Sequence, residues 1–143
     1  SDDEIHQLSD YGYNFGMAFQ IVDDILDFTG DEATLGKPDG SDLRQGTMTL
    51  PFFYYLRQHP DPAGLVAMVE AKHNQAENGE PDICLQTVGQ LVGAFCASDA
   101  IESARQEARA FLVRAQDNRA ALPDNTYKQS MLGLCDFVVH RTY

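Results

Sequence analysis

The chain has 143 residues, 43% of them hydrophobic, which is enough to bury the core of one domain. Its formal net charge of -12 excludes the basic surface that binding to nucleic acid or to an anionic membrane requires. No apolar run approaches the ~20 residues of a membrane-spanning helix, and the polar N-terminus SDDEIHQLSD is no signal peptide, so we expect a soluble, cytoplasmic protein.

The N-terminal part of the chain predicts one long helix followed by a long loop. Hydrophobic residues recur at helical spacing from about Glu4 to Phe28, and Gly30 is a residue type that commonly ends a helix. The segment that follows, TGDEATLGKPDGSDLRQG, is polar and rich in glycine, so it is predicted to be a loop.

The rest of the chain predicts further helices and no strand. A threonine cap at Thr49 and Pro51 in the first turn begin a helix over residues 49–58. Helical spacing then predicts helices at about 62–72, 84–95 and 101–115, and a last helix from about residue 127 to the C-terminus. The helix at 101–115 has an alanine-lined face. The turn-rich segment HNQAENGEPD predicts a loop at 73–82. The expected fold is an all-α helical bundle, one domain over residues 1–143.

The cysteines and histidines offer no metal site. Cys84, Cys96 and Cys135 are widely spaced among apolar residues, without a CxxC pair, and we expect reduced thiols that behave as small hydrophobic side chains. The four histidines are scattered and form no HxxxH or HExxH pair.

The first predicted helix carries an acidic stripe near its C-terminal end. At about 100° per residue, about a quarter to a third of its circumference holds Gly16, Gln20, Asp23, Asp24 and Asp27. The simplest interpretation is the solvated face of an amphipathic helix. However, these carboxylates repel one another at i,i+3 and i,i+4, and no Lys or Arg lies one turn away. They also lie where the helix dipole disfavours anions, so a bound cation would stabilise them.

The ligand type predicts which cation this stripe would bind. Carboxylates without a nearby histidine or thiolate suit hard ions such as magnesium, calcium or manganese. The twelve-residue calcium-loop pattern is absent. Magnesium usually takes one or two carboxylates and completes its shell with water and phosphate oxygens, so the stripe predicts a Mg²⁺-bridged phosphate site.

The loop after the stripe adds cations and one more carboxylate. Lys37 and Arg44 can contact phosphate oxygens, and Asp42 lies within reach of the same ions or their waters. The glycines of this loop allow the backbone to approach a ligand closely. Taken alone the segment is equally an ordinary polar connector, but its position directly after DDILD favours a phosphate site.

Together these segments resemble the second aspartate-rich region of trans-polyprenyl diphosphate synthases. The resemblance includes the GMAFQ lead-in, the DDILD stripe, LGKPDGSDL and the TLP that opens the next helix. It continues more weakly through AIESARQEARAFLVRAQDNRAALP to DFVVHRTY. It therefore covers nearly the whole chain and is most specific from Gly16 to Pro51.

The resemblance implies the isoprenoid synthase fold and a chain-elongating prenyltransferase of isoprenoid biosynthesis. In that reaction an allylic diphosphate loses its diphosphate, isopentenyl diphosphate attacks the resulting carbocation, and a proton is lost. By position, the implied site comprises Asp23, Asp24, Asp27 and Asp42 for Mg²⁺, Lys37 and Arg44 for the diphosphate, Gln20 and Lys37 as catalytic residues, and Phe19 as a pocket wall or a core residue.

The chain departs from the family pattern in two ways. Thr47 stands where many members carry lysine, and the first aspartate-rich motif, which belongs to the N-terminal half of the family, is absent. The segment Asp2–Glu4 lacks the spacing to replace that motif. We therefore expect a C-terminal fragment that carries the second half of the site, is inactive alone, and forms a homodimer or higher oligomer through apolar faces.

Two alternatives stay open at this point. The chain could be a non-catalytic subunit that needs a partner carrying the first motif, or a helical interaction module whose acidic stripe only improves solubility. Among enzymes, a terpene cyclase is the nearest competitor, and the LGKPDGSDL loop favours the chain-elongating branch.

Overall fold

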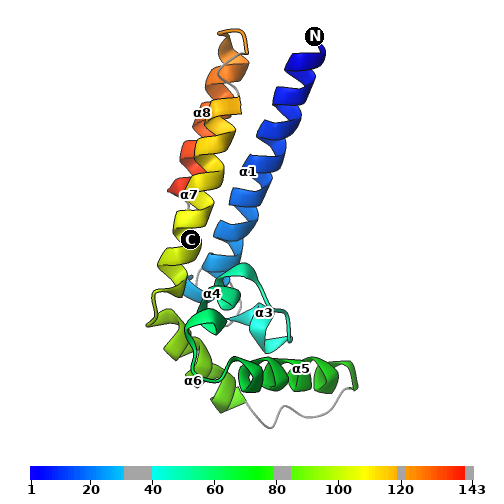
Figure 1. The fold of residues 1–143 in the computed structure, drawn as a ribbon, viewed down its shortest axis with the longest axis vertical. Coiled ribbons are helices and arrows are strands. Elements are labelled where there is room, and N and C mark those ends of the chain that lie inside the picture. The colour runs from blue at the N-terminus through cyan, green and yellow to red at the C-terminus, as the bar shows by residue number, and fades with distance from the viewer. Residues whose placement is uncertain (31–39, 79–84, 119–121, 141–143) are drawn as a thin grey trace. The chain divides into compact units, whose positions relative to one another are not determined.

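The computed structural model describes residues 1–30, 40–78, 85–118 and 122–140. Within these ranges the secondary structure is helical, without a strand, and the all-α prediction is confirmed (Figure 1). None of the helices described is long and apolar enough to cross a membrane. In chain order the helices are α1 (Asp2–Thr29), α3 (Ser41–Arg44), α4 (Leu50–Gln58), α5 (Pro62–Asn78), α6 (Leu85–Cys96), α7 (Ala100–Asn118) and α8 (Thr126–Val139).

Glycine and proline set the two helix boundaries nearest the predicted site, as expected. The helix α1 ends at Thr29, and the N–H of Gly30 donates to the carbonyl of Leu26 at 2.8 Å. Helix α4 has Pro51 in its first turn and Thr49 at the N-cap position. The position of the predicted threonine cap is confirmed, but its hydrogen bond is not formed. The Thr49 side chain makes no hydrogen bond to the helix, and its buried Oγ1 has no hydrogen-bond partner among the described residues.

Three helical segments differ from the prediction. Helix α8 ends at Val139, with His140 as its C-cap, where the prediction continued to the C-terminus, and residues 141–143 lie outside the described residues. Helix α5 continues to Asn78, so residues 73–78 are helical where a loop was expected, while the remainder of that predicted loop, 79–82, lies outside the described residues. The short helix α3 was not expected at all. It follows residues 31–39 of the glycine-rich loop, which also lie outside the described residues.

The chain divides into two compact units, which we describe separately. The first comprises Ser1–Asp23 with Arg105–Thr142, and the second comprises Asp24–Ala104. In both units α7 buries alanines, as its predicted alanine-lined face required, and these are Ala100, Ala104, Ala108 and Ala115.

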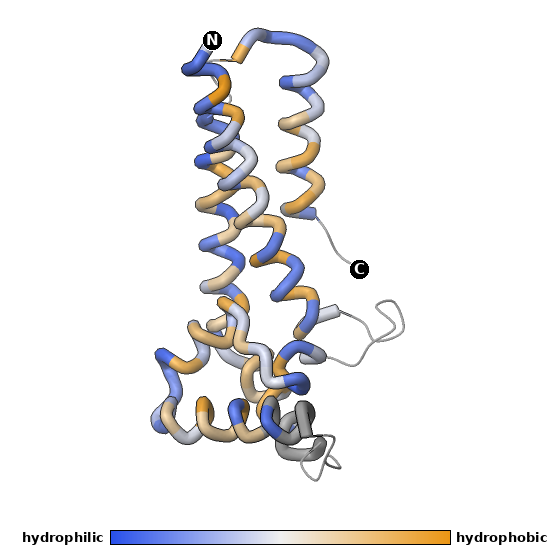
Figure 2. Tube along the Cα trace, turned by 90° about the vertical axis from the view of Figure 1, so that its right-hand side faces the viewer, coloured by the Kyte–Doolittle hydropathy of each residue, from blue (hydrophilic) through white to orange (hydrophobic). Residues whose placement is uncertain are grey.

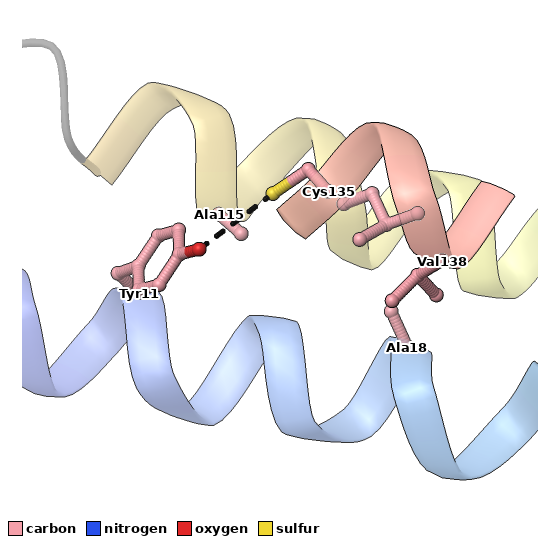
Figure 3. Close-up of a cluster of buried hydrophobic side chains, with 6 residues drawn as sticks. Tyr11, Ala18, Ala115, Cys135 and Val138 are labelled. Carbon is pink, nitrogen blue, oxygen red and sulfur yellow. Dashed lines mark hydrogen bonds between the residues drawn. The ribbon is translucent and has the colours of Figure 1, made fainter. Parts of the chain in front are cut away.

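The core of the first unit lies where α1 meets α7 and α8 (Figure 3). The phenol of Tyr11 donates to the carbonyl of Met131 at 2.9 Å, and the Cys135 thiol donates to the Tyr11 oxygen at 3.9 Å. The small Ala18 and Ala115 are fully buried beside them, so the backbones of these helices can approach closely. Figure 2 shows that α8 becomes mostly hydrophobic toward its C-terminal end.

The core of the second unit is aromatic and lies against the last turn of α1. The rings of Phe28 and Phe95 are 4.4 Å apart, and Tyr55 meets Phe95 edge-on at 5.7 Å. The Cys96 thiol donates to the carbonyl of Phe28 at 3.4 Å. Cys96 is nonetheless exposed, so it does not behave as the buried hydrophobic residue that the sequence predicted, whereas Cys135 does. This core fixes the end of α1 on which the acidic stripe lies.

Candidate functional site

The acidic stripe ends in two buried carboxylates rather than a fully solvated row. On α1, Asp23 is exposed, whereas Asp24 is 9% exposed and Asp27 only 3%. Burying a carboxylate is costly unless the protein supplies hydrogen bonds or opposite charge. The solvated-face interpretation therefore does not describe Asp24 and Asp27.

The chain returns from the loop directly onto Asp27. The N–H of Gly40 donates to the main-chain carbonyl of Asp27 at 2.7 Å, and the N–H of Asp42 donates to its carboxylate Oδ2 at 3.0 Å. The aspartate that ends the DDILD stripe thus accepts hydrogen bonds through both its main chain and its side chain. These contacts bring Asp27 and Asp42, two predicted metal ligands, together in the second unit.

Helix α3 carries Asp42 and Arg44 immediately after this contact. It begins at Gly40, whose φ of 66° lies in the left-handed region that favours glycine. A Cβ at this position would lie 2.6 Å from Val92 Cγ2 of α6, closer than carbon atoms can approach. Both Asp42 and Arg44 are half-buried, and the guanidinium of Arg44 extends toward Gly89 of α6.

The other predicted site residues lie on α1 or outside the described ranges. Phe19 and Gln20 lie in the first unit, about one helical turn before Asp23. Phe19 is 37% exposed, and Gln20 is also exposed. The ring of Phe19 lies 6.4 Å from that of Phe15, so Phe19 is partly packed and partly open to solvent. Lys37 lies outside the described residues.

The described carboxylates do not form a closed metal cage. Within the part of the chain that the structure describes, no three His, Cys, Asp or Glu side chains are placed to hold a metal ion by themselves. The available donors are carboxylate oxygens, which suit a hard divalent ion that also takes water and ligand oxygens. This donor set fits magnesium better than zinc, which requires three or four protein ligands.

Sequence reasoning missed the two backbone N–H groups that contact Asp27. They come from Gly40 and Asp42, at least 13 residues further along the chain, so no local pattern places them. The one available signal was Gly40 itself, because an Asp-Gly pair often marks a residue with positive φ.

Comparison with known proteins identifies the family to which this all-α chain belongs. The family model described as polyprenyl synthetase matches residues 1–85. The chain belongs to this family, and the resemblance inferred from DDILD and LGKPDGSDL is confirmed.

Several of the curated relatives are named as polyprenyl diphosphate synthases, and others as prenyl transferases. The chain is 33% identical over 144 residues to heptaprenyl diphosphate synthase component 2 of Bacillus subtilis, covering 100% of this chain and 38% of that protein. It is 35% identical over 133 residues to component 2 of Geobacillus stearothermophilus, covering 93% of this chain and 38% of that protein. The chain thus spans about two fifths of the length of these relatives.

Solved structures share this fold. Heptaprenyl diphosphate synthase from Staphylococcus aureus has a TM-score of 0.83 at 31% identity, covering 97% of this chain and 41% of that one. Polyprenyl synthase from Caulobacter crescentus, solved with calcium and isoprenyl diphosphate, has a TM-score of 0.79 at 28% identity, covering 100% of this chain and 42% of that one. The predicted isoprenoid synthase fold is therefore confirmed.

Proposed function

We propose that this chain supplies the second metal–diphosphate half-site of a polyprenyl diphosphate synthase. The enzyme condenses isopentenyl diphosphate with an allylic diphosphate. The observation that carries this proposal is the junction in the second unit, where the buried Asp27 accepts hydrogen bonds from Gly40 and Asp42. That junction joins the aspartate-rich helix to the loop that bears the predicted diphosphate-binding cations.

Magnesium is the metal that the donor set favours. Asp23, Asp24, Asp27 and Asp42 provide carboxylates and no softer ligand. Asp23, Asp24, Asp27 and Asp42 would hold the metal, and water and diphosphate oxygens would complete its ligand shell, as magnesium prefers. When bound, the metal supplies charge stabilisation for the diphosphate that leaves the allylic substrate.

The chain's own cations and its α1 residues complete the site. Lys37 and Arg44 bind diphosphate oxygens, and fixed cations of this kind stabilise the charge that develops on the leaving group. Gln20 lies near the diphosphate or the developing carbocation and orients it. Phe19, which is 37% exposed, provides an apolar wall beside that position.

The chain alone is inactive in this proposal, because half of a two-motif site cannot hold both substrates. Its span of about two fifths of the relatives supports this. We further propose that the chain self-associates, because large hydrophobic side chains are exposed, among them Ile5 at 68%, Phe53 at 48% and Tyr127 at 80%. A cytoplasmic location stays part of the proposal. Light scattering that shows a monodisperse monomer contradicts the self-association.

Calorimetric titration of the chain with a non-hydrolysable allylic diphosphate analogue, with and without magnesium, tests the half-site. Magnesium-dependent binding is expected, and Asp23→Ala should abolish it. Asp3→Ala is the matched control, because it removes the same charge from an exposed position in the first turn of the same helix. Equal binding by the parent and Asp23→Ala would leave the stripe without a ligand-binding role.

Activity tests separate the alternatives. Prenyl transfer by the 143-residue chain itself would refute its inactivity. Activity that appears on mixing with the N-terminal part of a relative would support the two-half site. Mixing that restores nothing, with no magnesium-dependent binding, would favour a helical interaction module.

A further inference from the structure

The first turn of α3 has no local side-chain cap. Its N-cap residue is Gly40, which has no side chain to accept a hydrogen bond from the turn. The first N–H groups of any helix lack partners within that helix, and a side-chain acceptor from Ser, Thr, Asp or Asn usually satisfies one of them. Here the N–H of Asp42, the second residue of α3, donates instead to Asp27 Oδ2 at 3.0 Å, 15 residues back along the chain.

Asp27 contacts the returning chain through both its main chain and its side chain. Its side chain is 3% exposed, and its carbonyl accepts the Gly40 N–H at 2.7 Å. Gly40 in turn has a positive φ and lies against Val92, with Phe28 next to it. The start of α3 is therefore held from both sides, by the end of α1 and by the core of the second unit. Asp23, by contrast, is exposed.

We propose that Asp27 is the positioning residue of the half-site, and that its carboxylate acts as the N-terminal cap of α3. The inference rests on the proposed function and refines it. In this refinement Asp27 leaves the set of direct metal ligands, which keeps Asp23, Asp24 and Asp42. Asp27 affects diphosphate binding through Asp42 and Arg44, whose positions it sets, while the exposed Asp23 contacts the metal ion. A hydrogen bond from a backbone N–H to an ionised carboxylate is shorter and stronger than a neutral one, which suits a residue that must fix a four-residue helix.

Two substitutions of similar size separate capping from charge. Asp27→Asn keeps an oxygen that can accept the Asp42 N–H but loses the negative charge, whereas Asp27→Leu loses both. Amide hydrogen exchange is measured by NMR on the whole chain without metal. Exchange at Asp42 should accelerate roughly tenfold or more in the Leu variant, from the strength of a charge-assisted hydrogen bond. In the Asn variant the oxygen still accepts the bond, so exchange should accelerate by only about a few-fold, because a neutral acceptor is weaker than a charged one.

Binding supplies the second readout. In calorimetry with magnesium and an allylic diphosphate analogue, Asp27→Asn should retain most of the parent affinity and Asp27→Leu should lose it. Asp23→Ala should lose binding while exchange at Asp42 stays unchanged. Equal loss of binding in both Asp27 variants would overturn the inference, because Asp27 would then act through its charge as a direct ligand.

The exchange data decide the capping role independently of binding. Unchanged exchange at Asp42 in a folded Asp27→Leu chain would overturn the inference. If the Leu variant does not fold, fast exchange at Asp42 in the Asn variant overturns it, because the acceptor oxygen is still present. Absence of magnesium-dependent binding in the parent counts against the proposed function, whereas the exchange rates still show whether Asp27 caps α3.

Discussion

Replacing Gly40 by alanine should destabilise the chain through two separable effects. The φ of 66° is a left-handed conformation, which costs an L-residue about 1–2 kcal/mol. The added Cβ would lie 2.6 Å from Val92 Cγ2, and relieving such an overlap costs about 1–3 kcal/mol. The free energy of unfolding should therefore fall by about 2–5 kcal/mol, the sum of these two ranges.

Urea denaturation followed by circular dichroism measures this loss. In a Val92→Ala background the overlap disappears, so Gly40→Ala should cost only the about 1–2 kcal/mol of the backbone term. The matched control is Gly12→Ala, because Gly12 lies within α1 and an added Cβ meets nothing within 4 Å. That substitution should stabilise the chain by about 0.5–1 kcal/mol. A Gly40→Ala chain as stable as the parent, or one fully restored by Val92→Ala, would refute the reasoning.

Three further substitutions test the cores and one cap by the same denaturation assay. Phe95→Ala removes a fully buried ring and should lower the free energy of unfolding by about 3–5 kcal/mol. The control Phe53→Ala, at a 48% exposed position, should lower it by less than about 1 kcal/mol. Equal losses of stability would contradict the assigned core. Tyr11→Phe removes the hydrogen bond to the Met131 carbonyl and should cost about 1 kcal/mol, the usual contribution of one such bond; no loss would mean that the bond is not formed. Asn125→Ala removes the side-chain acceptor for the Lys128 N–H at the start of α8 and should cost about 1 kcal/mol, with Asn125→Asp close to the parent; an equal loss in both variants would argue against capping.

The long helices could be predicted because their boundaries are local. Gly30 follows the last turn of α1, and Pro51 lies in the first turn of α4, so a few neighbouring residues determine each boundary. The extension of α5 to Asn78 was missed because a polar composition was interpreted as a loop. Ala, Gln and Glu in that segment are good helix formers, so propensity favoured the helix where hydrophobic periodicity was absent.

The burial of the site could not be predicted from the sequence. Helical spacing places Asp23, Asp24 and Asp27 on one stripe, but it does not show that Asp24 and Asp27 are covered while Asp23 is exposed. At Asp27 the return of the chain at Gly40 and the start of α3 supply the contacts, and α3 is too short to produce a periodic pattern. The residue types of the candidate site were therefore predictable, and the hydrogen bonds that organise it were not.

The buried alanines of α7 determine which substitutions this helix can accumulate. Ala100, Ala104 and Ala115 have no exposed surface and Ala108 only 2%, so a larger side chain would overpack the interior at a cost of about 1–3 kcal/mol. Glycine would weaken the helix instead. At the exposed Arg105 a substitution should be close to neutral. Substitutions that leave stability unchanged are thereby confined to the exposed side of α7.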